Sequence, residues 1–115
     1  MNSIKKNKEF RFIYNKGKSI ADSRLVLHKV SRSQTSARLG ISISSKVGNA
    51  VVRNKIKRRI KEIIRINEED ILNTDDIVFV VRVRCKDADF YQIQESVWYL
   101  LKKFKLLKDP SKKWK

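Results

Sequence analysis

A dense run of basic residues between positions 47 and 61 carries the clearest chemical signal in this sequence. Six of the nine residues from Arg53 to Lys61 are Arg or Lys. On a helix that turns by about 100° per residue, the polar side chains gather within an arc of about 100°. This arc holds Asn54, Lys57, Arg58, Lys61 and Arg65. Arginine guanidinium groups bind phosphate oxygens with two parallel hydrogen bonds, and lysines add point charges. The pattern therefore predicts a surface that binds a polyanion.

The opposite side of the same predicted helix is apolar. Four aliphatic residues lie within about 80° of one another on the helical wheel: Val52, Ile56, Ile60 and Ile63. Asn49 is predicted to cap this helix, which we expect to end near Asn67 because the acids that follow oppose the helix dipole. A solvated surface helix is the alternative, although Glu62 is its single acid. Charge alone does not separate RNA from DNA or from a lipid headgroup.

Aromatic residues near the N-terminus suggest a second contact with nucleic acid. Phe10 and Tyr14 lie one turn apart on a short helix that Asn7 is predicted to cap, that runs through Lys16 and that Gly17 is predicted to end. Two such rings could stack on unpaired bases at about 1–3 kcal/mol each. Packing in the core is the alternative, and the residues alone leave both open. Phe12 and Ile13 are predicted to anchor the helix.

The remaining elements must position these side chains. Strands are predicted at 23–30 and 37–44, joined as a hairpin by a polar turn at 31–36, and a strand buried on both faces is predicted at 77–84. The last helix is predicted to begin at Asp87 or Asp89. The order α-β-β-α-β-α predicts an α/β (α+β) two-layer sandwich, with one central sheet and helices packed on it. Residues 1–108 would form a single RNA-binding domain, and 109–115 a frayed basic tail.

Several polar side chains fall on the predicted strands. His28 shares one strand face with Val26, where a lone histidine is more often structural than a ligand. Arg82 and Arg84 end the buried strand. They either face the same cleft as His28 or cap an edge of the sheet. A basic, hydroxyl-lined floor is also possible on the second strand, from Arg38, Ser42, Ser44 and Lys46. No catalytic set or metal-ligand spacing is evident, and the acids at 68–76 are interpreted as a solubilising loop.

Composition narrows the class of partner. The chain has 115 residues, with 28 Lys and Arg against 12 Asp and Glu, so its net charge is 28 − 12 = +16. Nucleic acid and anionic membrane are the obvious partners of such a charge. No apolar run reaches the roughly 18 residues of a membrane span, and no secretory signal is visible. Cys85 is the only cysteine, so a cytosolic protein is the simplest expectation.

The spacing within the basic run resembles a known family. The segment from Val47 to Lys61 is similar to the signature of the bacterial ribonuclease P protein component. Its defining positions correspond to Ala50, Arg53, Asn54, Lys57, Arg58 and Lys61. The family often has arginine where this chain has Lys61. The positive charge is therefore kept, but the ability of a guanidinium group to bind one phosphate with two parallel hydrogen bonds is lost. Phe10, Tyr14, Gly17, the strands and the closing helix also follow the family's order.

The resemblance implies a fold, an activity and a set of binding residues. The family is ribosomal-protein-like, with a rare left-handed βαβ crossover, and it binds a catalytic RNA that removes the 5′ leader of precursor tRNA with Mg²⁺. No catalytic residue is expected on the protein, and a metal site on it is unknown. The residues predicted to bind the catalytic RNA are Lys46, Arg53, Asn54, Lys57, Arg58, Lys61 and Arg65. Lys46 and Arg65 come from the charge pattern, and the other five match the family's signature. Those implied for the leader are Phe10, Tyr14, His28, Arg82 and Arg84, although position 28 is commonly tyrosine in the family.

Three other functions compete with this interpretation. A ribosomal or general structured-RNA-binding protein would share the charge and fold without taking part in tRNA cleavage. A protein-only nuclease would need the acids near Asp75 and Asp76. DNA binding is disfavoured because a strand, not a second helix, follows the basic helix. The expected partners are therefore a catalytic RNA and precursor tRNA, not DNA or membrane, in the cytoplasm.

Overall fold

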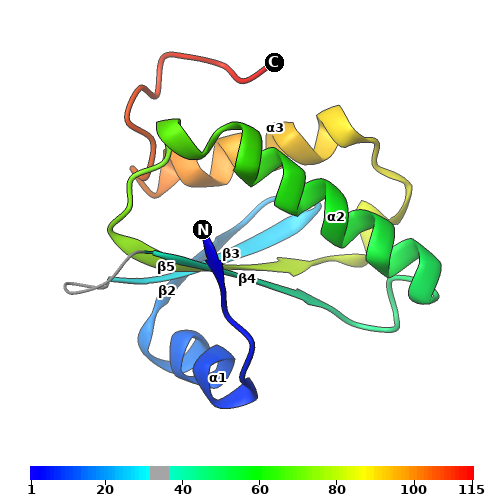
Figure 1. Ribbon diagram of the computed structural model, residues 1–115. Coiled ribbons are helices and arrows are strands. Elements are labelled where there is room, and N and C mark those ends of the chain that lie inside the picture. Colours follow the sequence, from blue (N-terminus) through cyan, green and yellow to red (C-terminus); the bar gives the residue numbers. More distant parts are fainter. Residues whose placement is uncertain (32–36) are drawn as a thin grey trace.

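A five-stranded sheet with helices on both faces forms the structure (Figure 1). The computed structural model describes residues 1–31 and 37–115, so most of the predicted turn at 31–36 lies outside the described residues. The strands are β1 (Asn2–Ser3), β2 (Lys18–Ala21), β3 (Leu25–Ser31), β4 (Arg38–Ile43) and β5 (Asp75–Val81). The helices are α1 (Asn7–Lys16), α2 (Ala50–Ile66) and α3 (Phe90–Lys103), with short 3-10 turns η1 (Glu68–Asp70) and η2 (Val83–Asp87).

The apolar strand β5 takes the centre of the sheet. The strand order is β1-β4-β5-β3-β2, with β4 parallel and β3 antiparallel to β5. The predicted strands at 23–30 and 37–44 correspond to β3 and β4. The predicted hairpin between them is wrong, because β5 lies between them in the sheet. The physical reason is burial: Ile77 and Phe79 face one side, Val78 faces the other, and all three are at most 1% exposed.

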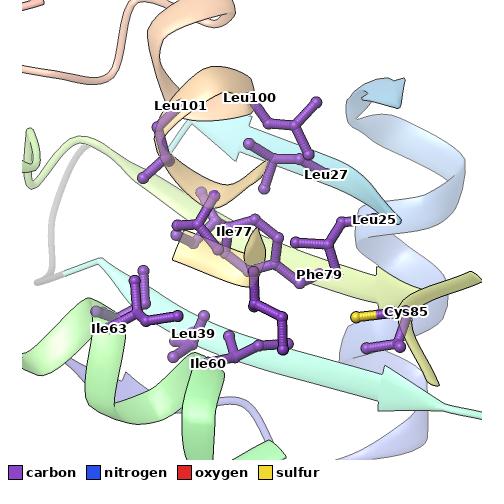
Figure 2. Close-up of a cluster of buried hydrophobic side chains, with 14 of the residues drawn as sticks. Leu25, Leu27, Leu39, Ile60, Ile63, Ile77, Phe79, Cys85, Leu100 and Leu101 are labelled. Atoms are coloured by element: carbon purple, nitrogen blue, oxygen red, sulfur yellow. The ribbon is translucent and has the colours of Figure 1, made fainter. Parts of the chain in front are cut away.

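The main core lies between the sheet and the layer formed by α2 and α3. Figure 2 shows aliphatic residues of both helices meeting Phe79 and Leu27 of the sheet. Each fully buried side chain of this size contributes about 1.5–3 kcal/mol relative to exposure. On the other face, Ile4 and Ile13 form a smaller cluster with Val78 under α1. The predicted central sheet with packed helices is confirmed, and α1 adds a partial layer on its second face.

The connection from β4 through α2 to β5 sets the direction of the basic helix. β4 and β5 are parallel neighbours, and α2 runs back across the sheet between them. In Figure 1 this crossover is left-handed, which is rare among such units and is the hand that the resemblance implied. Helix α2 begins with Asn49 as its cap, whose side chain accepts from the Val52 amide, as predicted.

Two short strands were not predicted. β1 has two residues, and β2 has four, of which only Ile20 is large and apolar. Their brevity and polarity suit the edges of a sheet, where long apolar strands would invite aggregation. The strand predicted to reach Arg84 ends at Val81, and the chain then turns into η2.

The end of the chain folds back toward α3. Asp89 caps α3 in a capping box with Gln92, which confirms the second of the two predicted starts. After α3, the Lys108 amide donates to the carbonyl of Asp70 at 2.8 Å, and the Trp114 indole donates to the Asp70 carboxylate at 2.9 Å. Whether residues 109–115 fray in solution stays a prediction.

Candidate RNA-binding surfaces

Three rings gather where α1 lies on the sheet, and we call Phe10, Tyr14 and His28 the aromatic cluster. The ring centroids of Phe10 and Tyr14 are 6.3 Å apart, and those of Tyr14 and His28 are 4.8 Å apart in an edge-on arrangement. Tyr14 is 37% exposed, and the other two rings are half-buried. The predicted rings are therefore brought together and remain accessible, which is what stacking on an unpaired base requires.

Two glycines allow α1 to approach the sheet closely. A Cβ atom at Gly40 would lie 2.8 Å from Cε1 of Phe10, so the ring can rest on β4 only because this residue has no side chain. A Cβ atom at Gly17 would lie 2.3 Å from the carbonyl oxygen of Lys29. The predicted end of α1 at Gly17 is confirmed, with close packing as its cause.

The anchoring of α1 differs in part from expectation. Ile13 is 1% exposed and packs on the sheet as predicted, whereas Phe12 is 53% exposed and does not anchor the helix. Asn7 was expected to cap α1, but Lys6 holds the cap position and makes no side-chain cap bond. Helix α1 thus rests on a small apolar contact.

An ion-pair network orients α1 further. The Arg38 guanidinium donates to the buried Asp76 carboxylate at 2.8 Å and also to Glu9 of α1. Hydrogen bonding to Arg38 lowers the pKa of Glu9, so this carboxylate stays charged. Arg38 was predicted only as part of a polar strand face, because its link to Asp76 depends on β4 and β5 being neighbours.

His28 lies at the position where the resemblance implied a tyrosine. Burial lowers the pKa of His28 below its ordinary value of 6.5, so the ring is neutral at pH 7. A neutral imidazole can stack on a base, and it has one nitrogen that donates a hydrogen bond and one that accepts. It adds no positive charge at that pH.

Arg82 and Arg84 lie beyond the end of β5, and both are exposed. The Arg82 guanidinium donates to the carbonyl of Asp22 at 2.8 Å, at the turn between β2 and β3. The residue opposite His28 is Val78, four positions before Arg82, or about 13 Å along a strand. Arg82 is therefore not part of the aromatic cluster, and a contact of either arginine with a leader stays a prediction.

The basic face of α2, defined as Asn54, Lys57, Arg58, Lys61 and Arg65, is exposed along its length. Ile56, Ile60, Ile63 and Ile64 bury the opposite side. Among the described residues, no ion pair engages Lys57, Arg58 or Lys61, so these cations are free to meet an external anion. Arg65 differs, because its side chain donates to Glu62.

Two further residues predicted for the catalytic RNA flank this face. Lys46 is exposed in the connection that precedes α2. Arg53 is half-buried, and its Nε donates to the carbonyl of Gly48 at 3.2 Å. This bond holds the guanidinium over the helix N-terminus, beside the basic face rather than within it.

A groove at the sheet edge joins the two surfaces, and we call it the edge groove. It has a volume of about 350 Å³, and its lining includes Phe10 of the aromatic cluster and Lys57 and Lys61 of the basic face. Lys5 also lines it, a residue that the sequence reasoning missed because nothing in its local pattern separates it from the other N-terminal lysines. RNA bound to one surface would thus lie near the other.

Comparisons with known proteins agree with this geometry. The family model described as Ribonuclease P matches residues 1–105. The chain belongs to the ribonuclease P family of proteins. Ribonuclease P protein components of Alkaliphilus metalliredigens and Clostridium botulinum are 41% and 46% identical to it, over 92% and 89% of this chain and 96% and 93% of theirs. These relatives match it along almost their whole length.

Solved structures of ribonuclease P proteins share the fold. The Staphylococcus aureus protein superposes with a TM-score of 0.86 at 41% identity, covering 94% of this chain and 99% of its own. The Thermotoga maritima protein superposes with a TM-score of 0.81 at 31% identity, covering 90% and 97%. The ribonuclease P fold thus extends over the aromatic cluster and the basic face.

Two features are absent from the part of the chain that the structure describes. No helix there is long and apolar enough to cross a membrane. No three side chains of His, Cys, Asp or Glu come together there as a candidate metal site. Cys85 is buried in the core, and burial raises its pKa to about 11, which fits a role in packing.

Proposed function

We propose that this chain is the protein subunit of a ribonuclease P holoenzyme that removes the 5′ leader of precursor tRNA. Its family membership supports the assignment to an endoribonuclease, and the supporting structural observation is the pair of surfaces on opposite faces of one sheet. The basic face of α2 would bind the catalytic RNA, and the aromatic cluster would bind the single-stranded leader. The protein would act in the cytoplasm, where tRNA precursors are made.

The basic face supports a contact with RNA phosphates. Its lysines and Arg58 project from one side of a helix whose other side is buried, so they can meet a phosphate backbone without moving the core. Each phosphate neutralised releases counterions, so binding should weaken steeply with salt. Asn54 lies among these cations, where its amide can both donate to and accept from a sugar, a base or a hydrated metal ion.

The aromatic cluster supports a contact with unpaired bases. Single-stranded nucleic acid is held by stacking on rings and by nearby cations, and both are present around α1. The edge groove would let the leader pass from Phe10 toward Lys57 and Lys61. Leader binding would therefore add affinity for precursor tRNA that mature tRNA lacks.

The proposal assigns the chemistry to the RNA subunit. Mg²⁺ prefers oxygen ligands and keeps several waters, so RNA phosphates suit it as ligands. The described residues bring together no carboxylate cluster of the kind that would hold the ion on the protein alone. When bound by the RNA, Mg²⁺ would activate water for phosphodiester hydrolysis. The protein's residues would hold substrate and screen the repulsion between two RNAs.

Reconstitution with the cognate catalytic RNA tests the proposal. Precursor cleavage is measured at low Mg²⁺ with and without the protein, where we expect the protein to increase the rate. The protein without RNA should cleave nothing, which also separates the proposal from a protein-only nuclease. Binding to structured RNA without any stimulation of cleavage would instead indicate a general RNA-binding protein and would overturn the proposal.

A further inference from the structure

The outer face of α3 carries two aromatic residues outside the buried stripe: Tyr91, which is exposed, and Trp98, which is half-buried and packs against the margin of the core. Tyr91, Glu95, Trp98 and Lys102 lie within about 60° of one another on the helical wheel, opposite the buried stripe that includes Val97. Tyr91 is 69% exposed. This face lies on the side of the sheet away from α1, so it is separate from the aromatic cluster (Figure 1).

The C-terminal segment completes a pocket over this face. Residues 106–115 lie beyond the part of the chain that the family model matches, and they fold back along α3. The resulting tail pocket has a volume of about 460 Å³, and its lining includes Tyr91, Glu95, Trp98, Lys113 and Trp114. This volume is in the ordinary range for a small-ligand site.

Hydrogen bonds from their N–H groups fix the two indoles, which are half-buried at the margin of the core. The Trp98 indole N–H donates to the carbonyl of Lys112 at 2.9 Å, and that of Trp114 donates to the Asp70 carboxylate at 2.9 Å. With both N–H groups already satisfied, the rings offer stacking rather than hydrogen bonding. Planar aromatic ligands are the class that such a surface binds.

The charge around the tail pocket favours an anionic ligand. Residues 102–115 contain seven lysines and one acid, Asp109, so this segment contributes 7 − 1 = +6. The ammonium groups of Lys102 and Lys113 lie over the Trp98 ring, 4.9 Å and 5.6 Å from its centre. A base that stacks on Trp98 would displace them from the ring toward its own phosphate. Glu95 supplies one acceptor that can take a hydrogen bond from an exocyclic amine.

We propose that the tail pocket binds an unpaired nucleotide of single-stranded RNA, with its base stacked on Trp98 and Trp114 and its phosphates held by lysines of the tail. Rings flanked by cations are the arrangement by which proteins hold single strands without reading sequence. The site gives the protein a second contact with unpaired RNA, on the face that the leader does not use. It does not depend on the leader assignment, because the pocket is formed by α3 and the tail alone.

Intrinsic fluorescence gives a direct test, because Trp98 and Trp114 are the only two tryptophans in the chain and both line the pocket. The probe is fluorescein-labelled hexa-adenylate for anisotropy and the unlabelled oligonucleotide for quenching. The assay uses a full-length variant with Phe10→Ala and Tyr14→Ala, so that the aromatic cluster cannot bind the probe. We expect this variant to bind the probe with quenching of tryptophan emission.

Adding Trp114→Ala should weaken that binding by about 5- to 150-fold, the loss of one stacked base. The control is Phe12→Ala, which removes an exposed aromatic ring from α1, outside the tail pocket, and should change nothing. An abasic oligonucleotide with the same number of phosphates should bind far more weakly than hexa-adenylate. The proposal is overturned if the starting variant does not bind, if Trp114→Ala binds equally well, or if the abasic probe binds as tightly. No catalytic RNA is present, so failure here is distinct from failure of the proposed function.

Discussion

Gly40→Ala should disturb the aromatic cluster through a single methyl group. The new Cβ would lie 2.8 Å from Cε1 of Phe10 and 3.1 Å from both Cζ of Phe10 and Cγ2 of Val78. Carbon atoms pack best at about 3.5–4.0 Å, so the ring must move by roughly 0.7 Å or more. Helix α1 cannot simply retreat, because Ile13 and the link from Arg38 to Glu9 hold it on the sheet.

The magnitude follows from two opposing effects. Overpacking a well-packed site costs about 1–3 kcal/mol, while replacing glycine by alanine in a strand returns about 0.5–1 kcal/mol. We therefore expect the free energy of unfolding to fall by about 1–2 kcal/mol in urea denaturation. Displacing the Phe10 ring should also weaken binding of precursor tRNA to the holoenzyme by about 5-fold, equivalent to about 1 kcal/mol of lost stacking.

A double-mutant cycle with Phe10→Ala isolates the contact. Once the ring is gone, the methyl group at position 40 has space, so Gly40→Ala should cost almost nothing in the Phe10→Ala background. Precursor binding should stay weak in the double variant, because the stacking surface is absent. Equal destabilisation by Gly40→Ala in both backgrounds would show that the ring does not rest on Gly40, and the reasoning would fail.

Three further predictions concern charge and burial. Lys57→Glu should weaken assembly with the catalytic RNA in a filter-binding assay. Lys55 is an exposed lysine of the same helix outside the basic face, so Lys55→Glu should have a much smaller effect. Equal effects would mean that the orientation of α2 does not matter. Glu9→Gln should reduce stability at about pH 6, and the difference from the unmodified protein should shrink as the pH falls below 4.5. Hydrogen bonding to Arg38 lowers the pKa of Glu9, so the contribution of the carboxylate is lost only as it is protonated in acid. A difference that does not depend on pH would exclude the ion pair as its cause. Cys85 should react with a thiol reagent at about pH 8 only as fast as the protein unfolds, and rapid labelling of native protein would contradict its burial. Stability should also fall as the pH rises from 9.0 toward 11, because the raised pKa disfavours the thiolate in the folded state.

Local pattern was enough to predict the elements that carry the binding residues. The basic and apolar sides of α2 follow directly from its helical period, and alternation in β3 correctly separates His28 from Leu27. The spacing of Phe10 and Tyr14 correctly predicted a shared aromatic surface. These features depend only on neighbours within a few residues along the chain.

Features that depend on the order of strands could not be predicted in the same way. The contact between Arg38 and Asp76 exists because β4 pairs with β5, whereas the sequence suggested a hairpin between β3 and β4. Arg82 and Arg84 were expected to extend the strand, but the chain turns after Val81. The tail pocket depends on a turn after α3 that brings Trp114 back to Asp70, and no periodic pattern marks that contact.

The relative affinity of the holoenzyme for precursor and mature tRNA is the most direct test of the account. The account predicts tighter binding of the precursor, and loss of that preference when Phe10→Ala and Tyr14→Ala remove two rings worth about 1–3 kcal/mol each, while assembly with the catalytic RNA is unchanged. Equal affinity of the unmodified holoenzyme for both tRNAs, or a preference that survives removal of both rings, would contradict it.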